Sequence, residues 1–171
     1  SPWPHRWAGL LAVAVFPLIW VGGLVTTTES GMAVPDYPTT FGYNPLLYPL
    51  STWLGGPWSV FIEHSHRLLA GVIILLVLPL AAACYRCETR RWVRWLAVGA
   101  VLLVLVQAML GGMRVLLDAR TLAMLHACIA HVFFTLAAAM TVVTSRWWRE
   151  QRPLEHASTG AVRQCTLLLP L

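Results

Sequence analysis

Three polar side chains near the start of one apolar segment could do chemistry. Glu63, His66 and Arg67 occur in the stretch VFIEHSHRLLAG, and the residues that follow it are almost all apolar. Ionisable groups inside a membrane-spanning segment are costly and by default mark a functional site. Another histidine, His126, occurs near the start of a later apolar segment. A carboxylate can move a proton or stabilise charge, and an imidazole can bind a metal.

His66 and His126 are predicted to lie at the same depth on two parallel helices. At about 1.5 Å per residue, each ring falls roughly 8–10 Å below the start of its helix. Two imidazoles at equal height can face each other across a flat macrocycle, and histidine is a common haem ligand. We therefore predict that His66 and His126 bind one haem iron. The alternative is that each histidine only makes a hydrogen bond between helices.

The residues around His66 favour the haem interpretation. Glu63, His66 and Arg67 share one helix face, because they are three and four residues apart. Glu63 is the candidate acid, base or orienting group. Arg67 and Arg114 are expected to pair with haem propionates, since a guanidinium binds a carboxylate in a fork. Small residues near the site are expected to leave room for the ring: Gly22, Gly23, Gly71, Gly111 and Gly112.

The other polar residues are predicted to have structural roles. His131 lies about 140° around the helix from His126, so it is expected to pack or to hydrogen-bond elsewhere. His64 is expected to point away from the site, and Gln107 to make an interhelical hydrogen bond. Two further histidines are expected to be solvated: His5 and His156.

The composition indicates a membrane protein. Of 171 residues, 58% are hydrophobic and 11% are charged, and the mean hydropathy is +0.68. A soluble domain carries about 25% charged residues, so this chain has too few to cover a globule in water. The net charge of +5 does not point to nucleic acid, because the arginines cluster beside the apolar segments.

Four apolar segments of about the length that a bilayer requires predict an all-α membrane protein with a four-transmembrane-helix bundle over residues 8–145. The loop 29–58 is rich in proline, glycine and aromatic residues. It is either a lid over the site or a connector with interfacial aromatic residues. The predicted spans are 8–28, 59–83, 95–114 and 121–144.

The distribution of arginine predicts the orientation. Residues 1–7 and the segments that follow the second and fourth spans carry arginine, whereas the loop 29–58 carries none. By the positive-inside rule, both ends of the chain face the cytoplasm or matrix. Residues 1–7 are then a cytoplasmic lead-in. Residues 146–171 are a cytoplasmic linker and the start of a truncated fifth span, or a short apolar tail.

Six motifs resemble the haem A synthase family in their order and spacing. Together they cover roughly residues 8–145 and resemble the amino-terminal four-helix half of that family. The motifs are Gly22-Gly23-Leu24-Val25-Thr26, Thr28-Glu29-Ser30-Gly31-Met32, Pro35-Asp36-Tyr37-Pro38, Glu63-His64-Ser65-His66-Arg67, Gln107-Ala108-Met109-Leu110-Gly111-Gly112 and Leu125-His126. The chain departs from the family at Thr26, where a basic residue is common, and in having no cysteine pair in the first outer loop.

The resemblance implies a membrane oxidoreductase that converts the C8 methyl group of haem O to the formyl group of haem A, for terminal oxidase biogenesis. It implies eight helices in two similar halves, each with a histidine pair, one for the substrate haem and one for haem b. By position, His66 and His126 match the amino-terminal pair, and Glu63 matches the glutamate implicated in the chemistry. We expect this chain to be the substrate-haem half.

The resemblance also implies a location and partners. The expected membrane is the bacterial cytoplasmic membrane or the mitochondrial inner membrane. The expected partners are haem, the lipid bilayer, and haem O synthase or another oxidase assembly factor, with a homo-oligomer as an open alternative. Two other functions stay open: a non-enzymatic bis-histidine membrane cytochrome or haem carrier in oxidase assembly, and a bundle without a cofactor.

Overall fold

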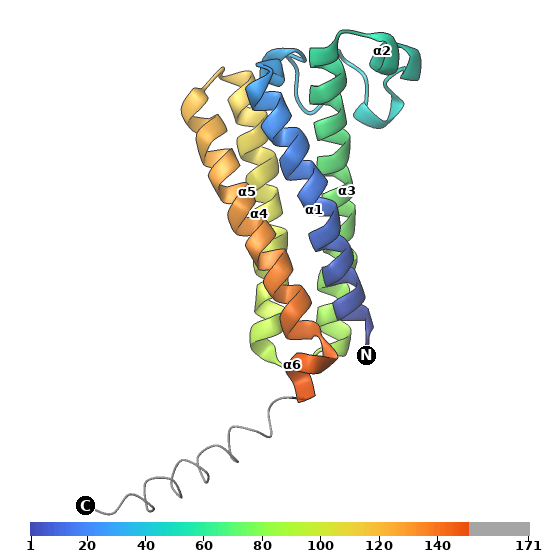
Figure 1. Cartoon of the computed structure of the whole chain (residues 1–171), viewed down its shortest axis with the longest axis vertical. Coiled ribbons are helices and arrows are strands. Elements are labelled where there is room, and N and C mark those ends of the chain that lie inside the picture. Colours follow the sequence, from blue (N-terminus) through green and yellow to red (C-terminus); the bar gives the residue numbers. More distant parts are fainter. Residues whose placement is uncertain (151–171) are drawn as a thin grey trace, which may run out of the picture.

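The computed structural model describes residues 1–150, and they form an all-α membrane bundle. Its four long helices are α1 (Trp3–Thr27), α3 (Trp58–Cys87), α4 (Arg91–Leu116) and α5 (Arg120–Thr144), which alternate in direction (Figure 1). Each is long and apolar enough to cross a membrane. The predicted fold class is therefore confirmed, and the chain has a multi-pass membrane location.

Short helices connect and extend the bundle. The loop between α1 and α3 contains two 3-10 turns, η1 (Ser30–Met32) and η2 (Pro45–Leu47), and the short helix α2 (Leu50–Gly55). This loop lies at one end of the bundle, which we call the outer end (Figure 1). After α5, the short helix α6 (Arg146–Glu150) lies at the opposite, inner end. The predicted fifth span lies outside the described residues.

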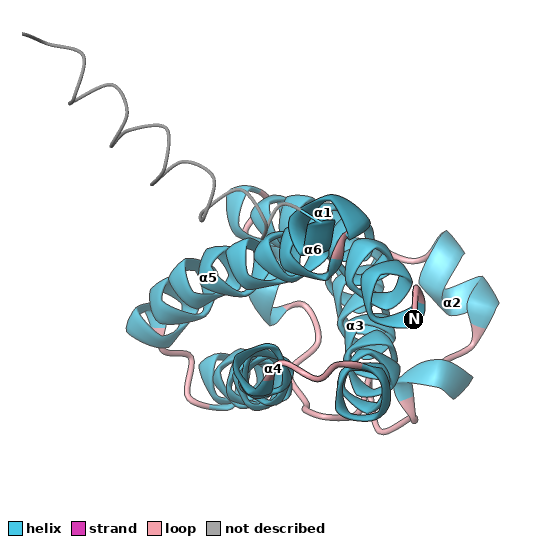
Figure 2. Ribbon diagram, turned by 90° about the horizontal axis from the view of Figure 1, so that it is seen from below, coloured by secondary structure: helices cyan, strands magenta, loops and turns pink. Residues whose placement is uncertain are grey.

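The four long helices pack as a square. α1 packs against α3 and α5, and α4 packs against the same two helices. Figure 2, which looks along the bundle, shows this arrangement, with α3 and α5 on one diagonal. Residues on the inward faces of α3 and α5 therefore face each other across the centre of the bundle.

The packed core fills only the inner half of the bundle. Its large buried residues recur at the helical spacing that keeps them on one face of each helix. Toward the outer end, the inward positions include small and polar residues such as Gly22, Gly111 and Gln107 beside apolar ones, and a cavity remains between the helices. The core residues are Ala8, Leu11, Val15, Ile73, Val77, Leu80, Cys84, Val93, Ala97, Ala100, Val104, Phe133, Ala137 and Met140.

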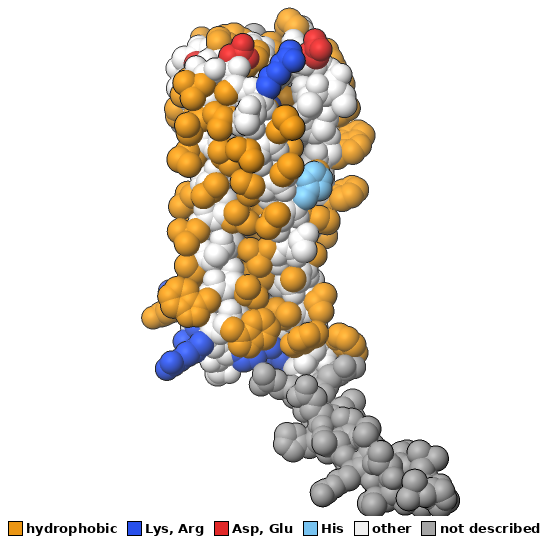
Figure 3. Space-filling model, turned by 90° about the vertical axis from the view of Figure 1, so that its left-hand side faces the viewer, with side chains coloured by type: hydrophobic (Ala, Val, Ile, Leu, Met, Phe, Trp, Pro, Cys, Tyr) orange, Lys and Arg blue, Asp and Glu red, His pale blue; other side chains and the backbone are white. Residues whose placement is uncertain are grey.

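The outside of the bundle is apolar along most of its length. Figure 3 shows hydrophobic side chains covering the face on the α5 side, with basic side chains at the inner end. Charged side chains of both signs lie at the outer end (Figure 3). An apolar belt between two charged ends is the surface that a bilayer requires.

The helices extend beyond the apolar spans at the inner end. α1 begins at Trp3 rather than residue 8, α3 ends at Cys87 rather than 83, and α4 begins at Arg91 rather than 95. Hydropathy marks the part of a helix that lies in lipid. An arginine can continue the helix past that part, because its apolar stem lies along the surface while its charge reaches water.

The turn between α3 and α4 is fastened by one carboxylate. Glu88 is buried and accepts hydrogen bonds from Arg90 Nε at 2.9 Å and from Arg90 Nη2 at 2.7 Å. Arg90 Nη2 also donates to the Val143 carbonyl of α5 at 2.9 Å. The Arg90 guanidinium lowers the pKa of Glu88 from 4.5 to about 2. This ion pair therefore ties three helices together at the inner end.

We expect the Glu88→Gln substitution to lower the free energy of unfolding at pH 7 by about 2 kcal/mol, because it removes a charged hydrogen-bond partner. The pKa of Glu88 is depressed in the folded protein, so its contribution is complete above pH 4.5 and is lost as the pH falls toward 2. Thermal unfolding in detergent at several pH values measures this. The exposed Glu150→Gln variant is the control, and equal stability of the two variants at pH 7 would contradict the assignment.

Candidate functional site

A cavity of about 400 Å³ occupies the outer half of the bundle, beyond the packed core. All four long helices line it, and so do Tyr37 and Pro38 of the outer loop. Four of the sequence-predicted site residues line it: Glu63 and His66 of α3, Arg114 of α4 and His126 of α5. Arg67 borders it as well. The structure thus brings together all five residues that the sequence singled out.

The His66 and His126 rings face each other across this cavity. Their centroids lie 6.4 Å apart, and the ring planes make an angle of 78°. His66 belongs to α3 and His126 to α5, the two helices on the diagonal of the square. The two rings are therefore at the same height, on inward faces, as the spacing predicted. Their role as haem ligands stays a prediction.

Hydrogen bonds orient the His126 ring. His126 Nδ1 lies 3.1 Å from the Gln107 carbonyl oxygen, so Nδ1 carries the proton and donates it. Gln107 Nε2 in turn donates to the His126 carbonyl at 3.0 Å, which joins α4 to α5 as predicted. This leaves the Nε2 lone pair of His126 available, the tautomer that a metal-binding imidazole needs. His66 Nδ1 is buried and has no hydrogen-bond partner within residues 1–150.

Glu63 and Arg67 form a buried ion pair at the outer edge of the cavity. Glu63 Oε1 accepts from Arg67 Nη2 at 2.8 Å, and the Glu63 side chain is only 1% exposed. Glu63 Oε2 accepts from the backbone N–H of Val34 at 2.9 Å. The carboxylate of Glu63 therefore contacts the outer loop as well as the cavity.

Arg67 fastens the outer loop to α3. Its Nη1 donates to the carbonyl oxygens of Asp36 at 2.6 Å and Thr39 at 2.7 Å, and its Nη2 donates to that of Val34 at 2.8 Å. We expected Arg67 to pair with a haem propionate. Its donors are instead directed at Glu63 and at loop carbonyls, so within residues 1–150 it acts as the anchor of the loop.

Arg114 is the basic residue that stays open to the cavity. Its guanidinium packs beneath Gly31 of η1, where a Cβ would lie 3.2 Å from Nη1. It takes part in neither of the two salt bridges found within residues 1–150. Of the two predicted propionate partners, Arg114 is therefore the one with donors available for an anionic ligand.

The loop itself is held in a defined shape. Asp36 accepts hydrogen bonds from the backbone N–H groups of Phe41 and Gly42, each at 2.8 Å, and from the Thr39 hydroxyl. Burial alone would raise the pKa of Asp36, but these hydrogen bonds outweigh it and lower the pKa to about 2. The loop between α1 and α3 is thus an ordered cover of the outer end.

His64 has the structural role that the sequence indicated. It is buried, and its Nδ1 lies 3.1 Å from the Thr40 hydroxyl of the outer loop. The Tyr48 and Trp53 rings pack against it, with centroids at 4.9 and 5.3 Å. His64 therefore secures the second half of the outer loop to α3.

Tyr37 is a site residue that the sequence reasoning did not single out. Its hydroxyl donates to the Ala108 carbonyl of α4 at 3.0 Å, and its ring fills the space that a side chain at Gly112 would need. Gly112 therefore accommodates Tyr37 rather than a haem. The signal was present in the Pro35-Asp36-Tyr37-Pro38 motif, but its contact with α4 depends on how the loop docks.

The remaining histidines lie away from the two facing rings. His131 is exposed at the rim of the cavity, and its Nδ1 lies 2.8 Å from the Ala127 carbonyl of its own helix. His5 was predicted to be solvated, which is wrong, because its Nδ1 lies 2.9 Å from the Thr141 carbonyl in a partly buried contact between α1 and α5. His156 lies outside the described residues.

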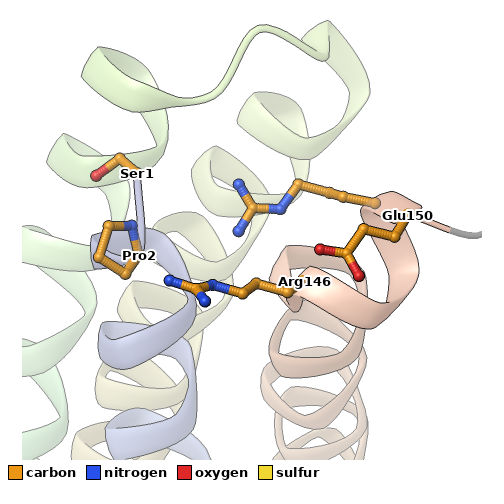
Figure 4. A pocket seen from close by; sticks show the side chains of 5 residues that line it. Ser1, Pro2, Arg146 and Glu150 are labelled. Carbon is orange, nitrogen blue, oxygen red and sulfur yellow. The ribbon is translucent and has the colours of Figure 1, made fainter.

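A second pocket at the inner end carries no comparable chemistry. It is lined by Ser1, Pro2, Arg146, Arg149 and Glu150 (Figure 4). It contains no histidine and lies at the opposite end of the bundle from His66 and His126. The outer cavity is therefore the candidate functional site.

Comparison with known proteins identifies relatives that share the same name. A curated protein named "Heme A synthase" from Bacillus pumilus is 28% identical over 155 residues, which cover 87% of this chain and 48% of the relative. The chain resembles haem A synthases. A second relative of that name, from Brucella ovis, is 27% identical over 152 residues, which cover 85% of this chain and 40% of the relative.

The similarity concerns one part of those proteins. The chain spans less than half the length of these two haem A synthases, which is consistent with the amino-terminal half that the motifs indicated. No family model matches the chain, and no solved structure matches it significantly.

Proposed function

We propose that this chain is a haem-binding half of a haem A synthase-like membrane enzyme, and that it holds the substrate haem. The proposed reaction oxidises the C8 methyl group of haem O to a formyl group, giving haem A for terminal oxidases. The observation that carries the proposal is the pair of facing imidazoles, whose centroids lie 6.4 Å apart across the cavity. The similarity to proteins named "Heme A synthase" supports the choice of reaction.

The spacing of the two rings fits a shared iron. Metal–imidazole bonds are about 2.0–2.1 Å long, and a ring nitrogen lies roughly 1.1 Å from its centroid, so two imidazoles that bind one metal ion would have centroids up to about 6.3 Å apart. The observed separation is 6.4 Å. The Gln107 carbonyl, by accepting from His126 Nδ1, also fixes the tautomer that leaves Nε2 free to bind iron. The residues present therefore fit a haem.

Each polar residue of the cavity then has a defined task. His66 and His126 would hold the haem whose methyl group is oxidised, and the four electrons removed would pass to an acceptor outside this chain. Arg114 pairs with a propionate, because its guanidinium borders the cavity without a carboxylate partner among residues 1–150. Arg67 keeps the loop and Glu63 in place.

Glu63 provides negative charge beside the reacting carbon. Each of its oxygens already accepts one hydrogen bond, from Arg67 or from Val34, but a carboxylate has about four acceptor positions. It therefore keeps capacity toward the cavity that it lines. We assign it the stabilisation of positive charge that develops at the methyl carbon, or the acceptance of a proton from an attacking water.

The Glu63→Gln substitution is expected to lower haem A formation about 100-fold, the effect of removing one electrostatic group that acts on the transition state. The neutral amide keeps the size of the side chain but removes the counter-ion of Arg67, so haem content per folded protein is measured beside haem A. The measurement is the ratio of haem A to haem O in pigments extracted from cells that produce the protein. Undiminished haem A in the Glu63→Gln variant would remove Glu63 from the mechanism.

The alternative proposal is a non-enzymatic bis-histidine cytochrome or a haem carrier in oxidase assembly. It uses the same imidazole pair but needs no group that acts on a methyl carbon. The pigment measurement separates the two functions. A haem b spectrum without haem A, when haem O is supplied, would favour the cytochrome or carrier and contradict the synthase.

The proposal also covers the orientation of the chain in the membrane and the proteins that it works with. By the positive-inside rule, the inner end faces the cytoplasm of a bacterium or the mitochondrial matrix, which places the haem in the outer leaflet. A second four-helix half with its own histidine pair would hold haem b, giving an eight-helix protein. Haem O synthase or another oxidase assembly factor is the proposed partner, and a second copy of the chain is the alternative.

A further inference from the structure

Each of the two facing imidazoles lies against a glycine of a neighbouring helix. A Cβ on Gly22 of α1 would lie 3.0 Å from Cε1 of His66 on α3. A Cβ on Gly111 of α4 would lie 3.2 Å from Cε1 of His126 on α5. In both pairs, the Nδ1 atom of the ring would lie 3.5 Å from that Cβ, and the Nε2 atom would lie 3.9 Å from it. The two contacts therefore have nearly the same geometry in two different helix pairs.

Helix packing by itself does not account for glycine at these positions. Glycine inside a helix is less stable than alanine, and close contact with a neighbouring side chain is one reason for its presence. At Gly23, the next residue of α1, a Cβ would meet nothing within 4 Å, and the same is true of Gly99 on α4. Gly22 and Gly111 thus differ from Gly23 and Gly99 because an imidazole occupies the space that a Cβ would need.

We propose that Gly22 and Gly111 are positioning residues that hold the His66 and His126 ring planes close to perpendicular, at the observed 78°. The inference rests on the proposed haem ligation and concerns how the ligands are oriented. A methyl group at either position would press on the ring edge that carries Cε1. The ring must then rotate about its bond to Cβ or move away from the glycine.

The two rings are expected to respond differently. His126 Nδ1 is tied to the Gln107 carbonyl at 3.1 Å, so rotation of this ring breaks a hydrogen bond. His66 Nδ1 has no hydrogen-bond partner within residues 1–150, so rotation of this ring breaks no bond at Nδ1. The Gly22→Ala variant should therefore keep haem with a changed ring angle, whereas Gly111→Ala should weaken haem binding more, by about tenfold.

The test is electron paramagnetic resonance of the full chain, purified in detergent and loaded with ferric haem (iron(III) protoporphyrin IX). Low-spin ferric haem with perpendicular axial imidazoles gives a highly anisotropic signal, and rotation toward parallel rings gives a rhombic one. We expect the anisotropic signal from the unaltered chain and a rhombic signal from Gly22→Ala. The matched control, Gly99→Ala, lies outside the cavity lining and should keep the anisotropic signal.

The outcomes separate this inference from the proposed function. A low-spin signal that is identical in the unaltered chain and in Gly22→Ala would overturn the role of Gly22 and leave haem binding intact. An unaltered chain that binds no haem would overturn the proposed function and the inference together. If Gly22→Ala does not fold, the double variant with His66→Ala should fold as well as His66→Ala alone, because the ring is gone. A double variant that still fails to fold would overturn the inference.

Discussion

The His126→Ala protein is expected to lose the low-spin haem spectrum and to bind haem more than about 100-fold more weakly, since a direct ligand matters more than the outer-shell partners whose loss costs 10–100-fold. His66→Ala should have the same effect, because both rings act on one iron. The double variant should retain no haem at the site. Absorption spectra and haem titration of the purified variants measure these changes.

The control for the histidine variants is His5→Gln. It removes an imidazole that bonds to Thr141 near the inner end of the bundle, away from the cavity. Its haem spectrum should match that of the unaltered protein. A His66→Ala or His126→Ala protein that keeps the low-spin spectrum and unaltered affinity would contradict the ligand assignment, and with it the proposed function.

The Arg67→Met substitution is expected to lower the free energy of unfolding by about 3–5 kcal/mol, the effect of removing one partner of a buried ion pair. Glu63 would be left buried without its counter-ion. The carbonyl groups of Val34, Asp36 and Thr39 would also lose their guanidinium donor. Denaturant unfolding in detergent measures the change, and limited proteolysis between residues 34 and 43 should reveal release of the loop.

Arg114→Met, on α4, is the matched comparison among the arginines that line the cavity. Arg114 has no carboxylate partner within residues 1–150, so its removal should change stability little and should weaken haem binding instead. The variant Arg67→Lys keeps the charge but not the planar fork, and an intermediate stability is expected. Equal losses of stability in Arg67→Met and Arg114→Met would contradict the anchoring role of Arg67.

Local sequence patterns were enough to predict the helices and the equal depth of the two histidines. A helix advances by a fixed rise per residue, so the position of His66 in one span and of His126 in another fixes their heights. The position of a polar side chain inside an apolar span predicted that Gln107 bonds between helices, which the structure confirms. The helix ends were less predictable, because arginine lets a helix continue beyond the lipid.

Contacts between the outer loop and the bundle could not be predicted in this way. Arg67 bonds to carbonyl groups 28 to 33 residues away in the chain, and Tyr37 bonds to Ala108 across 71 residues. No periodicity links such positions. The sequence therefore indicated two arginines of equal role, whereas the docked loop makes one an anchor and leaves the other open to the cavity.

What the sequence determines by itself is a four-span membrane bundle with two imidazoles at one height, since apolar length and helical rise are local properties. Only the tertiary structure decides that α3 and α5 lie on a diagonal, that the rings face each other across a cavity, and that glycines lie against them. These features depend on which helices pack side by side. Which helices pack together depends on how well side chains that are far apart in the sequence fit against each other.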